Sequence, residues 1–172
     1  LHFPKEVLAE AHAIANSRPD NQPSAEECAD RVDCRGHNVI TIDPDDARDF
    51  DDAICIQPAP SGKWKLWVHI ADVSHYVRPG SALDTEARKR GNSTYLVDRV
   101  IPMLPEALSN ELCSLKPDLD RLTKCVEFLL SKDGEVIKTK FYPAVIRSKR
   151  RYTYQEAYAV IQRKPEGTLE TM

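Results

Sequence analysis

The fold is decided by a stretch in the second half of the chain, LTKCVEFLLSKDGEVIKTKFYPAVI (residues 122–146). Two runs rich in apolar and β-branched residues flank the dipeptide Asp133-Gly134. This dipeptide is typical of a tight β-hairpin turn, because both residues tolerate the left-handed backbone that such a turn requires. The stretch therefore predicts two long antiparallel strands, over residues 122–131 and 136–146.

Further strands are expected toward the amino end of the chain. Residues 53–57 and 64–70 alternate between apolar and polar side chains, and the segment between them contains Pro58, Pro60 and Gly62. Alternation that is interrupted by turn residues predicts a second hairpin. A further strand-like run covers residues 38–42 and follows Gly36.

Helices are predicted by start signals between and around these strands. Ser24 and Thr153 are each followed three residues later by a glutamate, which is the spacing of a capping box. Pro4 suits a first helical turn. We expect helices over residues 4–16, 24–31, 81–89 and 153–162. The mixture predicts an α+β (mixed α/β) fold, with a mixed, largely antiparallel sheet flanked by helices.

Composition limits the class of protein. The 172 residues are 41% hydrophobic and 30% charged, which suits one globular domain or part of a larger one. The apolar runs are too short to span a bilayer, and five cysteines without a C-x-x-C pair favour a reduced, cytoplasmic protein. Residues 1–59 hold 13 acidic and 5 basic residues. This excess of acidic residues in the first part of the chain suits either a protein that binds an anion through a metal or a solvated surface of mixed charge.

The most informative segment for function is an acidic loop, TIDPDDARDFDDAI (residues 41–54). Six carboxylates lie within residues 43–52, and their repulsion must be relieved by solvent or by cations. Apolar runs on both sides tie the ends of the loop to a sheet, which favours cations. Carboxylates without histidine or thiolate suit Mg²⁺ or Mn²⁺, and four of them are enough for a pair of ions.

Other acidic motifs fit the loop less well. A calcium-binding EF-hand that started at Asp43 would need Gly and Glu at the positions of Arg48 and Ile54. Asp45-Asp46-x-x-Asp49 matches the metal motif of isoprenoid synthases, but that motif belongs on a helix. The D-x-D motif of phosphatases should follow an apolar strand directly, which it does not do here. A fully solvated loop remains a second interpretation.

Several blocks in the same order strongly resemble the RNB catalytic domain of the ribonuclease II and ribonuclease R family, with the ribonuclease R type closer. The blocks are TIDPDDARDFDDA (41–53), VHIADVSHYV (68–77), RKRGNSTYL (88–96), IPMLP (101–105) and LSNELCSL (108–115). The resemblance covers about residues 3–162. It implies a metal-dependent hydrolase that degrades RNA processively from its 3′ end and releases nucleoside 5′-monophosphates.

The resemblance also implies roles for particular residues. Asp43, Asp49, Asp51 and Asp52 match the catalytic, metal-holding aspartates, and Asp51 is expected to position or activate the attacking water. Tyr95 matches a tyrosine that stacks on a base near the RNA 3′ end. Tyr154, Lys149 and Arg150 are further RNA-binding candidates. The last two belong to residues 138–151, which hold six basic and no acidic residues, a pattern that suits a single strand or one solvated strand face.

The resemblance further predicts how the chain is organised. Residues 1–34 would be a helical linker, and residues 35–172 the N-terminal part of the catalytic domain. The downstream arginine and aromatic clamp of the family, and its flanking OB-type RNA-binding domains, have no match here. We expect a monomer and no membrane, and we expect the fragment alone to be inactive. A non-catalytic RNA-binding relative and a metal-dependent small-molecule phosphohydrolase remain alternatives.

Overall fold

The computed structural model describes residues 2–18 and 20–162, so residues 163–172 of the predicted catalytic part lie outside the described residues. Within the described residues, a seven-stranded sheet has the order β1-β8-β7-β4-β3-β2-β9, and β5 and β6 form a separate hairpin. The strands are β1 (Val32–Asp33), β2 (Ile40–Asp43), β3 (Asp52–Ala59), β4 (Lys63–Ala71), β5 (Thr94–Tyr95), β6 (Val100–Ile101), β7 (Asp120–Leu130), β8 (Val136–Arg147) and β9 (Arg150–Thr153).

Both predicted hairpins are present. β3 pairs antiparallel with β4, and β7 pairs antiparallel with β8 across the turn that contains Gly134. β4 and β7 are also antiparallel neighbours, which joins the two hairpins into one sheet. Two short parallel pairs complete it, β1 with β8 and β2 with β9. The mixed, largely antiparallel sheet that the sequence predicted is therefore confirmed.

The helices begin where the capping signals place them. Ser24 and Glu27 form a complete capping box, and the Ser81 hydroxyl accepts a hydrogen bond from the Asp84 amide. The Thr153 hydroxyl likewise accepts from the Glu156 amide at 3.1 Å. The helices are α1 (Lys5–Asn16), α2 (Ala25–Ala29), α3 (Val73–Tyr76), α4 (Ala82–Arg90) and α5 (Tyr154–Gln162), with a 3₁₀ turn η1 (Pro60–Gly62) and a π-helix η2 (Ala107–Leu112). Sequence reasoning did not predict α3, η2, β1 or β9.

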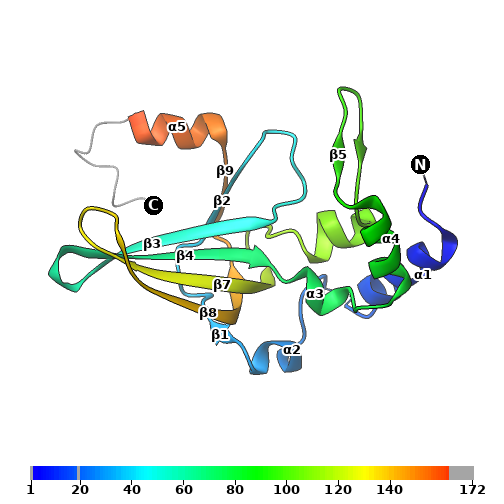
Figure 1. Cartoon of the computed structure of the whole chain (residues 1–172), viewed down its shortest axis with the longest axis horizontal. Helices are drawn as coiled ribbons and strands as arrows, with labels where there is room; N and C mark the ends of the chain where they lie inside the picture. The colour runs from blue at the N-terminus through cyan, green and yellow to red at the C-terminus, as the bar shows by residue number, and fades with distance from the viewer. Residues whose placement is uncertain (1, 19, 163–172) are drawn as a thin grey trace.

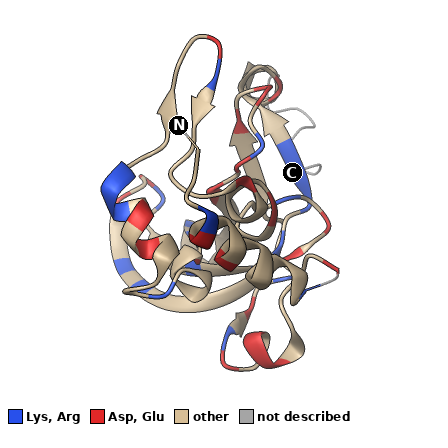
Figure 2. Ribbon diagram, turned by 90° about the vertical axis from the view of Figure 1, so that its right-hand side faces the viewer, with Lys and Arg blue, Asp and Glu red and all other residues tan. Residues whose placement is uncertain are grey.

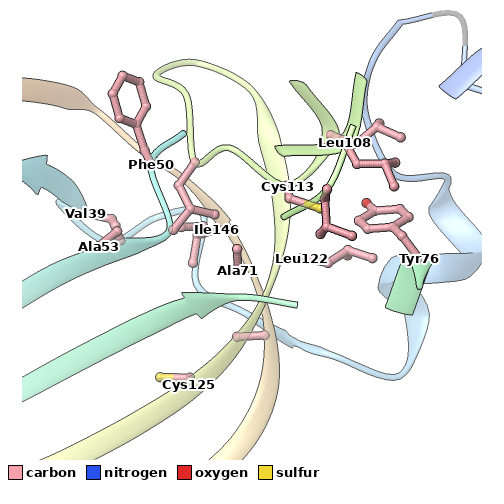
Figure 3. Packing of buried hydrophobic residues seen from close by; sticks show 14 of the residues in the cluster. Val39, Phe50, Ala53, Ala71, Tyr76, Leu108, Cys113, Leu122, Cys125 and Ile146 are labelled. Atoms are coloured by element: carbon pink, nitrogen blue, oxygen red, sulfur yellow. The ribbon is translucent and has the colours of Figure 1, made fainter. Parts of the chain in front are cut away.

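One continuous core holds the sheet and helices together. Side chains from α1, α4 and η2 are buried in the same cluster as residues of the central strands. Figure 3 shows Tyr76, Leu108, Cys113 and Leu122 gathered at one end of the sheet. All five cysteines are free thiols. No helix in the described part of the chain is long and apolar enough to cross a membrane.

The sheet brings the ends of the acidic loop together. β2 ends at Asp43 and β3 begins at Asp52, and these two strands pair antiparallel. The intervening residues therefore leave the sheet and return to it at the same place. Figure 1 shows this loop rising on the same side of the molecule as the β5–β6 hairpin. The space between loop and hairpin contains the candidate site.

Candidate functional site

The four aspartates that the sequence singled out line one cavity. Asp43 is the last residue of β2 and Asp52 is the first residue of β3. Asp49 and Asp51 lie in the loop between these strands. The cavity has a volume of about 490 Å³. Its other walls are the β5–β6 hairpin and η2. In Figure 2, acidic segments lie between the upright hairpin and a strand with a basic run.

The side chains approach one another without forming a finished metal cluster. In residues 2–18 and 20–162, no group of three or more His, Cys, Asp or Glu side chains is arranged to hold a metal ion. Asp43 is only 8% exposed, and its Oδ2 has no hydrogen-bond partner within the described chain. A buried carboxylate oxygen without a partner is costly. This atom therefore suits a cation.

Crowding of negative charge changes the proton affinity of the site. Burial of its carboxyl group raises the pKa of Asp51 to about 6, and the charges of Asp49, Asp52 and Asp43 raise it as well. Burial also raises the pKa of Asp43, and the Thr41 side chain and the positive charge of Arg151 oppose this rise without reversing it. Without a cation, the cluster is therefore a repulsive arrangement that the rest of the fold maintains.

Tyr95 and Arg151 lie outside the acidic loop and contact it directly. The Tyr95 hydroxyl, which comes from β5, donates a hydrogen bond to Asp49 Oδ2 at 3.0 Å. Arg151, on β9, donates to the carbonyl oxygens of Pro44 and Asp45, the latter at 2.9 Å. The parallel pairing of β9 with β2 places Arg151 beside the start of the loop. Sequence reasoning included Arg151 in a basic segment but did not predict that it holds the loop.

The predicted RNA-binding residues are divided between two places. Tyr95 is 65% exposed and lines the cavity. Tyr154, which is 58% exposed, starts α5, while Lys149 and Arg150 lie where β8 turns into β9. These three do not line the cavity. The Arg150 guanidinium lies 4.2 Å from the centre of the Tyr152 ring and 3.8 Å from Glu156.

The rest of the basic segment extends away from the site. Lys138 and Lys140 lie on β8 opposite Leu129 and Glu127 of β7. Across the sheet, Asp52 pairs with Ile70 of β4, which pairs with Lys124 of β7. Lys124 in turn pairs with Pro143 of β8, further along the same strand than Lys138 and Lys140. Along β8, Lys140 lies three residues and Lys138 five residues from Pro143, in the direction of the β7–β8 turn and away from the acidic cavity.

A second charged group ties the amino-terminal region to the sheet. Asp72, which follows β4, is 2% exposed, and its Oδ2 lies 2.7 Å from an Arg31 guanidinium nitrogen and 3.3 Å from Lys124 Nζ. The Ser74 hydroxyl donates to Asp72 Oδ1 at 2.8 Å. Although burial would raise the pKa of Asp72, the hydrogen bond from Arg31 holds it below its usual value. Asp72 is therefore part of a structural ion pair and does not line the acidic cavity.

Comparison with known proteins identifies the family of the chain. The sequence model of the RNB domain family matches residues 31–171 of the chain. Ribonuclease R of Thermotoga maritima is 51% identical over 153 residues, which make up 89% of this chain and 21% of that protein. Ribonuclease R of Escherichia coli is 52% identical over 134 residues, which make up 78% of this chain and 16% of that protein. The chain thus spans about a fifth of the length of these relatives.

Solved structures show the same fold. Mycoplasma genitalium RNase R in complex with ribose methylated single-stranded RNA superposes with a TM-score of 0.83 at 37% identity, over 96% of this chain and 25% of that chain. Yeast Ssd1, a pseudonuclease, has a TM-score of 0.76 at 20% identity over 97% of this chain and 23% of that chain, which shows a shared fold alone. The sequence match and the shared architecture lead to one conclusion: the chain belongs to the RNB domain family.

Proposed function

We propose that this chain supplies the carboxylate side of the active site of a hydrolytic, processive 3′-to-5′ exoribonuclease, which releases nucleoside 5′-monophosphates from RNA. The observation that carries the proposal is that Asp43, Asp49, Asp51 and Asp52 line one cavity together with Tyr95. The similarity to proteins named ribonuclease R supports the substrate class. The proposal includes a reduced, cytoplasmic setting, which five free thiols support.

The residues present fit a divalent cation such as Mg²⁺ or Mn²⁺. All four candidate side chains offer hard oxygen atoms, and the buried Oδ2 of Asp43 lacks any other partner in the described chain. Asp43, Asp49 and Asp52 would hold the cation, and the proposal includes two ions when RNA is bound. Bound there, such ions would supply electrostatic activation of water and of the scissile phosphate.

Asp51 has the properties of a group that handles a proton. Without a cation, burial and the neighbouring carboxylates raise the pKa of Asp51 to about 6, so this carboxylate holds a proton more tightly than an isolated aspartate; a bound cation would lower that pKa. The ring of Tyr95 offers a face for a base near the 3′ end. Tyr154, Lys149 and Arg150 would contact the sugars and phosphates upstream, where only the 2′-hydroxyl distinguishes RNA from DNA.

The test uses a protein that contains this chain and has the full length of its ribonuclease R relatives. Digestion of 3′-labelled and 5′-labelled RNA should release labelled monophosphate at once only from the 3′ label. Asp51→Asn should abolish hydrolysis and leave RNA binding nearly intact, because the basic and aromatic contacts remain. Asp45→Asn is the matched control, since Asp45 belongs to the same loop but does not line the cavity. A large loss of RNA binding in Asp51→Asn would contradict this division of roles.

The isolated chain should bind Mg²⁺ or Mn²⁺ weakly and show little or no exonuclease activity. The physical reason is that it presents one carboxylate cluster without the arginine and aromatic clamp that the family resemblance places downstream. Efficient metal-dependent release of monophosphates by the chain alone would contradict this expectation. The proposal also treats residues 1–34 as a linker, the parent as a monomer and OB-type domains as its flanks.

A non-catalytic RNA-binding role is the second candidate. The observation in its favour is that the aspartates of the described residues are not arranged as a finished metal cluster. RNA binding by the full-length parent that neither needs a divalent cation nor leads to cleavage would favour this role. Cleavage that requires the cation would exclude it.

A further inference from the structure

The acidic loop is attached to a buried serine, Ser114. Ser114 Oγ accepts a hydrogen bond from the Phe50 amide at 3.0 Å and donates one to the Arg48 carbonyl at 2.7 Å. The next residue, Leu115, donates its amide to the Phe50 carbonyl at 2.9 Å. These three bonds hold the backbone on both sides of Asp49 and immediately before Asp51.

Ser114 is itself held by a buried arginine. Arg121, at the start of β7, is 1% exposed, and its Nε donates to the Ser114 carbonyl at 2.7 Å. Its remaining hydrogen bonds go to the backbone carbonyl oxygens of Asn21, Asp120 and Glu111. Burying a guanidinium is costly unless its donors are satisfied. Arg121 therefore ties two other backbone segments, at Asn21 and at residues 111–114, to β7.

These contacts form a continuous path from the centre of the sheet to the carboxylates. Arg121 pairs with Ile146 of β8, and β4 begins to pair with β7 two residues later, at Thr123. This pairing restrains the backbone of Arg121. The guanidinium restrains the Ser114 backbone through its hydrogen bond to the Ser114 carbonyl. The Ser114 hydroxyl in turn restrains the loop through its bonds to Phe50 and Arg48.

We infer that Ser114, fixed by Arg121, is a positioning residue that sets the distance of Asp49 and Asp51 from Asp43 and Asp52 across the acidic cavity. The inference rests on the proposed metal-holding role of these carboxylates. Repulsion among them would otherwise push the loop outward. The serine hydroxyl restrains it at the two backbone groups that flank Asp49, without approaching the carboxylates itself.

The test compares Ser114→Ala with Ser148→Ala in this chain. Ser148 is equally buried, and its hydroxyl donates to the carbonyl oxygens of Val39 and Arg150 and not to the loop. Mn²⁺ affinity is measured by electron paramagnetic resonance of the free ion, and amide hydrogen exchange is measured at Phe50. Ser114→Ala should weaken Mn²⁺ binding about five- to thirtyfold, since two hydrogen bonds are lost. It should also accelerate exchange at Phe50, while Ser148→Ala should change neither.

Each outcome decides the inference. Wild-type Mn²⁺ affinity in folded Ser114→Ala, or an equal loss in Ser148→Ala, would overturn it. If Ser114→Ala does not fold, Ser114→Cys, which retains a weak donor and acceptor, should give an intermediate affinity, and unchanged affinity would again overturn it. A wild-type chain that binds no Mn²⁺ at millimolar concentration would overturn the metal-holding role. Failure of the parent to cleave RNA, with the Mn²⁺ effect intact, would count against the proposed function alone.

Discussion

Asp51→Asn should stabilise this chain at neutral pH when divalent cations are absent. The pKa of Asp51 rises from 3.8 to about 6 in the folded state, so its ionisation opposes folding. Taken at face value, this rise corresponds to at most about 3 kcal/mol. The carboxyl group of Asp51 is crowded by neighbouring atoms, but the residue as a whole still has an exposed surface. Solvent screening therefore reduces the expected gain to about 1 kcal/mol in the free energy of unfolding.

The pH dependence of the gain follows from the same pKa. The wild-type chain should lose stability as the pH rises from 3.8 toward about 6, because the folded state must then release a proton that it holds more tightly than the unfolded state. The amide of the variant does not titrate. Its advantage should therefore be full above the folded-state pKa and should disappear below the unfolded one.

Urea denaturation with a chelator present, followed by the fluorescence of Trp64 and Trp67, measures the effect at about pH 7.5 and about pH 4. Asp45→Asn removes the same charge from the same loop outside the cavity and is the control. The reasoning is refuted if Asp51→Asn is no more stable than Asp45→Asn at the higher pH, or if its advantage persists unchanged at the lower one. Added Mn²⁺ should stabilise the wild-type chain more than the variant.

Three further changes probe other parts of the structure. Asp72→Asn should cost about 1–3 kcal/mol in urea denaturation, because the buried Arg31 guanidinium loses its charged partner; unchanged stability would show that the pair is dispensable. In a full-length parent, Tyr95→Ala should weaken RNA binding about tenfold by fluorescence anisotropy, since a stacked base contributes roughly 1–3 kcal/mol, and Tyr95→Phe should have little effect; equal losses would implicate the hydroxyl instead. Thr153→Ala should cost about 1 kcal/mol and accelerate amide exchange in α5, whose capping bond it removes, whereas Thr153→Ser should preserve both.

Short-range patterns in the sequence were sufficient for most of the elements. The hairpin at Asp133-Gly134 and the capping box at Ser24 involve residues a few positions apart, so the physical causes lie within each segment. The acidic loop could also be identified directly, because six carboxylates in ten residues require relief of their repulsion. The grouping of Asp43 with Asp49, Asp51 and Asp52 was expected from the family resemblance, and all four line one cavity in the structure.

Only the tertiary structure decided what surrounds and restrains that loop. β9 pairs with β2 through a long connection, and this pairing puts Arg151 beside Pro44. Tyr95 reaches Asp49 from a hairpin of only two-residue strands. The role of Ser114 depends on Arg121 in a central strand. These contacts join segments that are remote in sequence, and side-chain periodicity carries no information about which remote partners chain closure brings together.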